Sequence, residues 1–134
     1  MMPDVVVLDA SVGVKWFRAE RGSDAARDLL VAHRNAETVI AVDTLFTYEV
    51  LGALSRSRTG AHVHEVWHDL AAWNLEVLPL SEKLIVAASA QRDALGCSLY
   101  DAFSAGLASL LRCPLVSADA QAHGSFPDVR ILGA

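Results

Sequence analysis

The sequence predicts an α/β fold, a three-layer α/β/α sandwich with a mostly parallel central sheet. Two observations carry this prediction. Short apolar runs without polar alternation recur along the chain, as at residues 5–8 and 38–42. Strands that are covered on both faces, which is the habit of parallel strands, have this composition. These runs also alternate with longer segments of helical pattern, which favours βαβ units.

Each expected element has its own signal in the sequence. Strands are expected from apolar runs at residues 5–8, 38–42, 75–80, 114–117 and 129–132. Helices are expected from spaced apolar positions at residues 12–17, 24–34, 45–58, 61–74, 82–95 and 99–111. Ser23, Ser81 and Ser98 suit helix N-caps, and Gly96 suits a left-handed C-cap. No repeat or linker interrupts the pattern, so residues 1–134 are expected to form a single domain.

Composition narrows the classes of function. The chain is 53% hydrophobic and 20% charged, which is typical of a globular protein. Its formal net charge is −5. Proteins that coat nucleic acid without sequence preference are usually basic, because phosphate contacts supply most of their affinity. The charge therefore argues against a large RNA- or DNA-binding surface, but it allows a small site in which metal ions supply positive charge.

The location expected for the chain is cytoplasmic, without a membrane partner. No apolar run approaches the roughly 18–20 residues that a membrane-spanning helix needs, and the N-terminus lacks a basic region. Cys97 and Cys113 flank the helix expected at residues 99–111, which would hold them roughly 24 Å apart. A disulfide needs Cα atoms within about 7 Å, so two free thiols are expected.

Four acidic residues fall at strand-to-helix transitions. Asp9 follows the first strand, Glu49 lies one to two turns into the helix after the second, Asp101 lies in a first helical turn, and Asp119 follows the strand after that helix. Parallel strands bring such transitions to one edge of a sheet. Carboxylates gathered without basic partners repel one another, so a divalent cation is expected. Ligation by oxygen alone favours Mg²⁺ or Mn²⁺ over zinc.

Each of these acids also has a structural interpretation. Asp9, Asp101 and Asp119 stand where side chains cap helices or turns. Glu49 lies in an apolar sector of its helix and could reach solvent past Arg56. The hypothesis of a metal site depends on all four acids falling at the same edge.

The stretches around these acids resemble a known family, the PIN domain, and within it the VapC-type toxin ribonucleases of bacterial toxin–antitoxin pairs. The resemblance covers residues 5 to 132. The stretches that carry it are Val7-Leu8-Asp9-Ala10-Ser11, Tyr48-Glu49-Val50-Leu51-Gly52-Ala53-Leu54, Gly96-Cys97-Ser98-Leu99-Tyr100-Asp101-Ala102 and Leu115-Val116-Ser117-Ala118-Asp119.

The resemblance implies a catalytic, metal-binding site formed by Asp9, Glu49, Asp101 and Asp119. It implies an Mg²⁺- or Mn²⁺-dependent endoribonuclease in which activated water attacks the RNA phosphodiester. It also implies a cognate antitoxin protein that blocks the site. The positions of Ser11 and Ser117 match the hydroxyls that support the acids.

The chain departs from the family pattern at three places. Ser117 stands where threonine is commoner. Asp43 stands where a proline often precedes the helix that carries Glu49. No further acid follows Asp119 until Asp128, so the site is expected to hold one metal ion firmly and a second only with substrate.

Contacts with RNA and with a second copy are also expected. Arg18, Arg21, Arg56 and Arg58 are candidates for RNA contact, although any one of them suits an ordinary solvated surface equally well. The helix at residues 45–54 is apolar around most of its circumference, which favours burial against another chain, plausibly a homodimer. Trp67 and Trp73 are further candidates for such contacts.

Two alternative functions remain open. His64-Glu65-Val66-Trp67-His68 matches the H-E-x-x-H signature of zinc metalloproteases on an expected helix. No third ligand stands out, although Glu76, Glu82 and His123 are possible. The other alternative is a catalytically silent module that binds RNA or the antitoxin without cleaving RNA.

Overall fold

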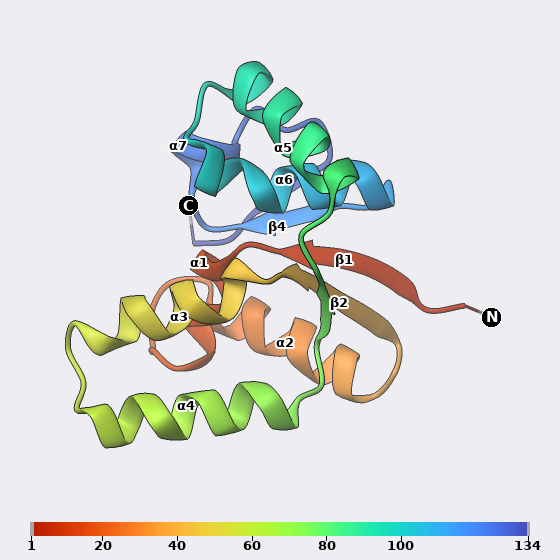
Figure 1. Ribbon diagram of the computed structural model, residues 1–134. Helices are drawn as coiled ribbons and strands as arrows, with labels where there is room; N and C mark the ends of the chain where they lie inside the picture. Colours follow the sequence, from red (N-terminus) through yellow and green to blue (C-terminus); the bar gives the residue numbers. More distant parts are fainter. Residues whose placement is uncertain (1, 134) are drawn as a thin grey trace.

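The computed structural model describes residues 2–133 and has a central five-stranded sheet between two layers of helices (Figure 1). Every strand pair is parallel, and the order across the sheet is β3-β2-β1-β4-β5. The strands are β1 (Asp4–Leu8), β2 (Thr38–Asp43), β3 (Glu76–Leu78), β4 (Leu115–Ser117) and β5 (Val129–Ile131). The expected three-layer α/β fold with a parallel sheet is therefore confirmed.

The helices lie at or close to the expected positions. They are α1 (Ala10–Gly13), the 3₁₀ helix η1 (Val14–Trp16), α2 (Ser23–Arg34), α3 (Leu45–Ser55), α4 (Gly60–Ala72), α5 (Glu82–Leu95), α6 (Leu99–Leu111) and α7 (Ala120–His123). Ser81 and Ser98 cap α5 and α6 through their side chains, as their positions predicted. Gly96 ends α5 with a φ of 67°.

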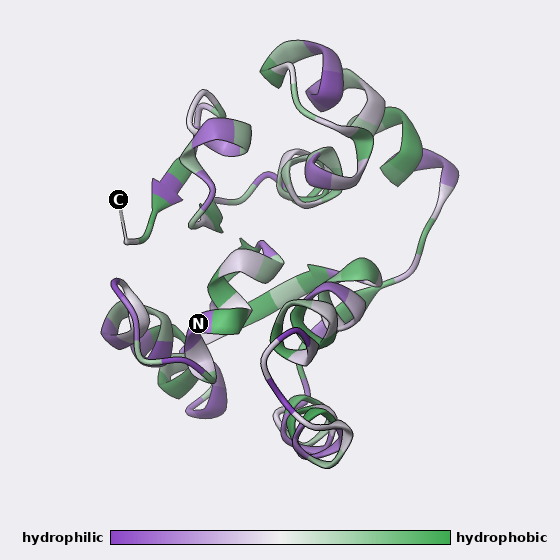
Figure 2. Cartoon of the chain, turned by 90° about the vertical axis from the view of Figure 1, so that its left-hand side faces the viewer, coloured by the Kyte–Doolittle hydropathy of each residue, from purple (hydrophilic) through white to green (hydrophobic). Residues whose placement is uncertain are grey.

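Strand β1 is buried on both faces, as its unbroken apolar run predicted. Val6 and Leu8 belong to the core beneath the sheet, which α1, α2, α3 and α4 cover, whereas Val7 belongs to the core that α5 and α6 cover. Figure 2 shows hydrophobic residues along β1 at the centre of the molecule. This two-sided packing fixes the end of β1, and with it the residue that follows.

Some boundaries differ from expectation. Asp9 begins α1 directly, because its side chain accepts a hydrogen bond from the Ser11 amide, so the helix starts two residues earlier than the pattern indicated. Helix α3 ends at Ser55 rather than at residue 58, with Arg56 as its C-cap. Helix α7 lies between the strands expected at residues 114–117 and 129–132, where no helix was expected.

The two helical layers are packed differently. Beneath the sheet, the Trp16 indole donates to the Ala26 carbonyl at 2.8 Å and packs edge-on against Trp73, which stacks on Phe17. Above the sheet, α5 and α6 approach so closely that a Cβ on Gly106 would lie 2.7 Å from the Ala88 Cα and backbone nitrogen.

Within residues 2–133 no single helix is long and apolar enough to cross a membrane. Among these residues only α5 and α6 taken together have the length and apolar composition of a span, and a bend of 113° separates them. Both cysteines are free, as expected.

The close approach of α5 and α6 yields the first testable prediction. Gly106→Ala should lower the free energy of unfolding by about 1–3 kcal/mol, because the added methyl meets backbone atoms that cannot rotate away. Gly52→Ala is the matched control in α3, where nothing lies within 4 Å of the added Cβ. It should stabilise the chain by about 0.5–1 kcal/mol. Chemical denaturation of both variants measures the difference, and equal effects would contradict the packing described.

Candidate active site

The candidate site lies at β1, where the order of the strands across the sheet reverses direction. The chain runs outward from β1 through β2 to β3, and then returns to place β4 on the other side of β1. In open α/β sheets, ligands bind at such a switch point, outside the carboxyl ends of the strands. Asp9 follows β1 and Asp119 follows β4, and the Asp9 amide donates to the Val116 carbonyl at 3.0 Å.

The four predicted acids line one cavity at this edge. Asp9, Glu49, Asp101 and Asp119 surround a volume of about 310 Å³, together with Ser11 and Arg56. An adjoining cavity of about 270 Å³ shares Asp101 and Asp119 and extends toward Cys97. The structure therefore brings together residues that lie as far as 110 positions apart in the sequence.

Hydrogen bonds fix the Asp9 carboxylate. Its Oδ2 accepts from the Ser11 amide at 3.1 Å and from the Ser11 hydroxyl at 2.7 Å. Its Oδ1 accepts from the Ser104 hydroxyl of α6 at 2.9 Å. The Ser11 hydroxyl also accepts from the Ala118 amide at 2.9 Å, which links β1 to the segment after β4. Ser11 therefore both holds the Asp9 carboxylate and joins it to the segment after β4.

Asp119 is fixed as well, and Ser117 contributes to this. The Asp119 Oδ1 accepts from the Ala122 amide at 3.0 Å, so the residue caps α7. Its amide donates to the Ser117 hydroxyl at 3.0 Å. The capping interpretation and the site interpretation are thus compatible for Asp119, as they are for Asp9, because each carboxylate keeps lone pairs that the caps do not use.

Glu49 and Asp101 are held less firmly. The hydrogen bonds of Asp101 run through its backbone, whose amide donates to Ser98 and whose carbonyl accepts from His123. Glu49 is exposed on α3 rather than embedded in an apolar sector, which corrects the expectation from the helical pattern. Partial desolvation, followed by the charges of Asp9, Asp43 and Asp101, raises the pKa of Glu49 from 4.5 to about 7.

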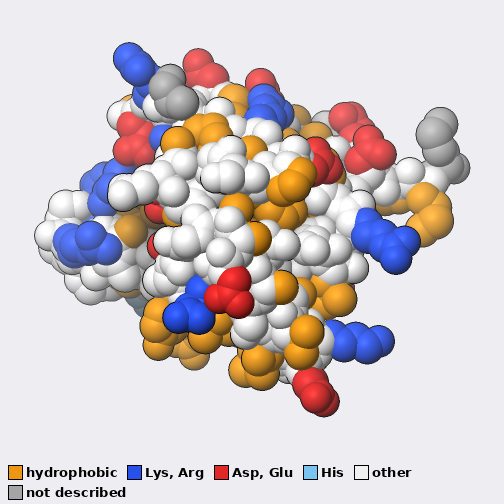
Figure 3. All heavy atoms as spheres, turned by 90° about the horizontal axis from the view of Figure 1, so that it is seen from above, with side chains coloured by type: hydrophobic (Ala, Val, Ile, Leu, Met, Phe, Trp, Pro, Cys, Tyr) orange, Lys and Arg blue, Asp and Glu red, His pale blue; other side chains and the backbone are white. Residues whose placement is uncertain are grey.

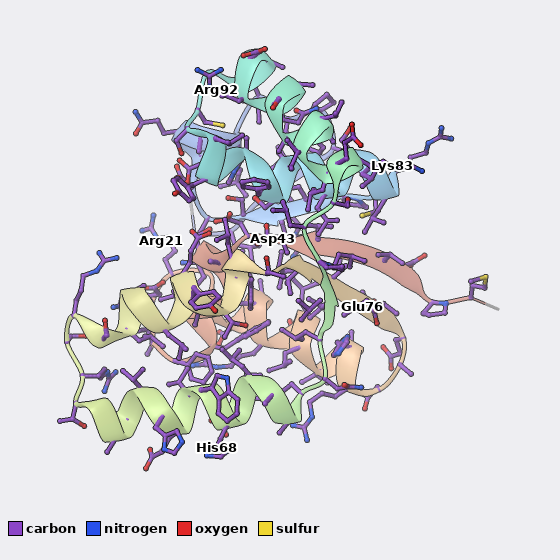
Figure 4. The ribbon with its side chains drawn as sticks, in the orientation of Figure 1. Arg21, Asp43, His68, Glu76, Lys83 and Arg92 are labelled. Carbon is purple, nitrogen blue, oxygen red and sulfur yellow. The ribbon has the colours of Figure 1, made fainter. Side chains whose placement is uncertain are left out.

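Asp43, which stands where the family pattern often has a proline, is a further acidic residue beside the site. It ends β2, and its Oδ1 accepts from the amides of Leu45 and Phe46 at 2.9 and 3.1 Å. Figure 4 shows it near the centre of the molecule, where β2 passes into α3. Burial, and to a smaller extent the charge of Asp9, raises the pKa of Asp43 above its usual range. Asp43 therefore adds to the negative potential of the site.

A divalent cation suits the donor chemistry of this cavity. The side chains offer carboxylate oxygens, which Mg²⁺ and Mn²⁺ prefer. Positive charge would also relieve the repulsion from Asp9, Asp43 and Asp101, which adds to desolvation in raising the pKa of Glu49. Within residues 2–133 no three His, Cys, Asp or Glu side chains already converge on one point. Ligation by three residues therefore requires a change of rotamer, which Glu49 and Asp101 can make most readily because no described hydrogen bond holds their carboxylates.

The four candidate arginines are not equivalent. Arg56 lines the acidic cavity. The Arg18 guanidinium donates to the Ala53 carbonyl at 2.9 Å and so joins the loop after η1 to α3. Arg21 and Arg58 are exposed and line no part of that cavity.

The H-E-x-x-H segment lies apart from the acids. His64 and His68 are exposed on α4 with ring centroids 4.5 Å apart, and Figure 4 shows His68 at the lower edge of the view, away from Asp43. Glu65 lies 3.8 Å from the His62 ring nitrogen. The described residues provide no third ligand grouped with the pair, and a catalytic zinc site needs three. The geometry therefore does not support a metalloprotease.

His123 and Ser104 are residues of this site that sequence reasoning missed. The sequence offered His123 only as a possible third zinc ligand, yet its side chain is fully buried between Asp101 and Ser117. Ser104 reaches Asp9 from a position 95 residues away. Only the helical spacing of Ser104, three residues after Asp101, could have pointed to it.

Comparison with known proteins is consistent with this fold. Residues 6–129 match the family model described as the PIN domain. No curated protein sequence matches the chain significantly. Among solved structures, a chain of a toxin–antitoxin complex from Klebsiella pneumoniae is similar, with a TM-score of 0.72 and 16% identity over 93% of this chain and 95% of that one.

Two further structures are similar at comparable levels. One is VapBC2 from Rickettsia felis bound to a promoter DNA fragment, with a TM-score of 0.71, 17% identity, and coverage of 95% of this chain and 96% of that one. The other is VapC20 from Mycobacterium tuberculosis, described as a toxin that cleaves the sarcin–ricin loop, with a TM-score of 0.67, 15% identity, and coverage of 93% and 98%. At these identities the likeness shows a shared fold. Because the family model spans nearly the whole chain, the conclusion is that this protein belongs to the PIN-domain family.

Proposed function

We propose that the protein is an Mg²⁺- or Mn²⁺-dependent endoribonuclease that acts as the toxin of a toxin–antitoxin pair. The observation that carries this proposal is the common cavity lined by Asp9, Glu49, Asp101 and Asp119 at the carboxyl ends of β1 and β4. Membership of the PIN-domain family supports it. So does the similarity of the fold to VapC20, which is described as a toxin that cleaves the sarcin–ricin loop.

The residues of the cavity have distinct parts in the proposed reaction. Asp9 and Asp119 would hold a cation from fixed positions, while Glu49 and Asp101 would turn toward it. A bound divalent cation supplies activation of water and neutralises charge on the phosphodiester. Arg56, at the rim, would contact an RNA phosphate, and Arg18, Arg21 and Arg58 are weaker candidates for that contact. No side chain need act as a covalent nucleophile.

The alternatives differ in what they predict. A silent RNA- or antitoxin-binding module would show binding without cleavage in Mg²⁺. Against it, the cavity concentrates carboxylates with a single arginine, which suits a cation better than it suits a nucleic acid alone. The metalloprotease alternative has no specific observation in its favour.

We also propose that the protein acts in the cytoplasm with two protein partners, an antitoxin and a second copy of itself. The similar structures from Klebsiella pneumoniae and Rickettsia felis are toxin–antitoxin complexes. The face formed by α5 and α6 exposes Ile85, Val86, Leu99 and Tyr100, and Figure 3 shows hydrophobic side chains between the charged ones there. Light scattering of the purified chain measures its oligomeric state and so tests the homodimer.

Cleavage of RNA tests the proposed activity directly. Total RNA should be cut in Mg²⁺ and left intact in EDTA, with mapped ends defining the sites. Asp101→Asn should reduce the rate by more than the ~10–100-fold that loss of an outer-shell partner costs, because it removes a charged ligand. Asp69→Asn, on the exposed face of α4, is the matched control and should cleave normally. Undiminished cleavage by Asp101→Asn would rule out the assigned site.

The arginines separate by their effect on substrate binding. We expect Arg56→Ala to raise the KM for RNA several-fold with little change in kcat, because a rim cation contributes to binding more than to bond cleavage. Arg58→Ala removes the same charge two residues away and outside the cavity, so its KM should stay near the parent value. Steady-state kinetics on a short RNA measures both, and equal KM values would contradict the role of Arg56.

The raised pKa of Glu49 gives a pH dependence of stability. Because the pKa in the folded chain, about 7, exceeds 4.5, the folded state binds this proton more tightly than the unfolded state. Protonation of Glu49 therefore contributes fully to the stability of the folded chain below pH 4.5, and this contribution is lost as the pH rises through 7. Metal-free Glu49→Gln should therefore have a higher Tm than the parent at pH 8 and the same Tm near pH 4.

The control for this measurement is Glu37→Gln, which removes an exposed carboxylate distant from the acids. Its Tm difference from the parent should not change between the two pH values. If Glu49→Gln and Glu37→Gln behave alike in calorimetry, the repulsion described at the site is absent.

A further inference from the structure

His123 is completely buried, and the proposed reaction gives it no part. Its imidazole lies between the two elements that carry Asp101 and Asp119. The Nδ1 atom is 2.7 Å from the Ser117 hydroxyl, and the Nε2 atom is 2.6 Å from the Asp101 carbonyl oxygen. The backbone amide of His123 also donates to the Asp119 carbonyl at 3.0 Å.

The partners of the imidazole specify where its proton lies. A carbonyl oxygen can only accept, so the contact with Asp101 requires a hydrogen on Nε2. The Ser117 hydroxyl already accepts from the Asp119 amide, which leaves its own hydrogen to donate to Nδ1. The tautomer with a hydrogen on Nε2 alone satisfies every group, whereas a hydrogen on Nδ1 would leave the Ser117 hydroxyl without an acceptor.

The same ring also approaches Ser104, the α6 serine that holds Asp9. Its Nε2 lies 3.5 Å from the Ser104 hydroxyl, and that hydroxyl donates to Asp9. One imidazole therefore contacts the backbone of Asp101, the serine that holds the Asp119 amide, and the serine that holds Asp9. These contacts join α6 to the segment between β4 and α7 in a region closed to water.

From these contacts we propose that His123 is a positioning residue, which sets the separation of Asp101 and Asp119 and thereby the affinity of the acidic cavity for a divalent cation. The inference rests on the proposed metal-dependent function, and it assigns to that site a residue that touches neither metal nor substrate. A histidine suits the position because it offers a donor and an acceptor on opposite sides of one rigid ring.

The test is Mn²⁺ binding, measured from the electron paramagnetic resonance signal of the free ion, without RNA. His123→Phe fills the space but removes both hydrogen bonds, and it should raise the Kd for Mn²⁺ by ~10–100-fold, the usual effect of losing an outer-shell partner. His123→Gln keeps a donor near the Nε2 position and should lose less affinity. With RNA, kcat should fall for His123→Phe while KM stays near the parent value.

His33 provides a matched control. It also bridges two elements, accepting from the Ile40 amide at 3.0 Å and contacting the Trp73 carbonyl at 3.1 Å, but it lies on α2 away from the acids. His33→Phe should therefore lower thermal stability and leave the Mn²⁺ Kd within about two-fold of the parent value. This comparison separates positioning of the acids from a general loss of stability.

The possible results are distinct. If the parent binds Mn²⁺ and His123→Phe binds it equally well, the positioning role is wrong while the proposed function stands. If the parent neither binds Mn²⁺ nor cleaves RNA, both proposals fail. If His123→Phe does not fold, two other measurements decide. His123→Gln with a Mn²⁺ affinity equal to that of the parent would overturn the role of His123. So would a ¹⁵N spectrum of the parent imidazole that places the hydrogen on Nδ1.

Discussion

Repulsion among carboxylates at one edge of the sheet is the constraint on which the rest of the site depends. Partial desolvation, and after it the charges of Asp9, Asp43 and Asp101, raise the pKa of Glu49, so the fold holds these side chains closer than their charges favour. The two-sided burial of β1 and the caps on Asp9 and Asp119 provide the opposing stability. The same negative charges that repel one another in the absence of metal would attract a divalent cation to the cavity.

Most of the fold could be predicted because its signals are local. The β-branched runs of β1 and β2 specify strands buried on both faces, and parallel strands place their carboxyl ends at one edge. This alone predicted that Asp9 and Asp119 would lie near each other, although 110 residues separate them. The bounds of α1 and α3 were less predictable, because a side-chain cap began one helix and the other ended in an exposed segment without a glycine.

The inner support of the site could not be predicted, because its contacts have no periodicity in the sequence. Ser104 reaches Asp9 across 95 residues, and His123 reaches Asp101 across 22. A single histidine in a polar segment resembles a surface residue until the fold encloses it. The His64–His68 pair shows the opposite case, since its motif matches a known signature but α4 presents it to solvent without a third ligand.

The order of the strands has a consequence for synthesis. Asp9 and Glu49 belong to the first half of the chain, whereas Asp101 and Asp119 arrive only with α6 and the segment after β4, which inserts beside β1 on the side away from β2. A nascent chain that still holds these last residues inside the ribosome therefore has only half of the acidic cavity. The cavity can therefore be complete only after the segment that follows β4 has emerged and β4 has paired with β1.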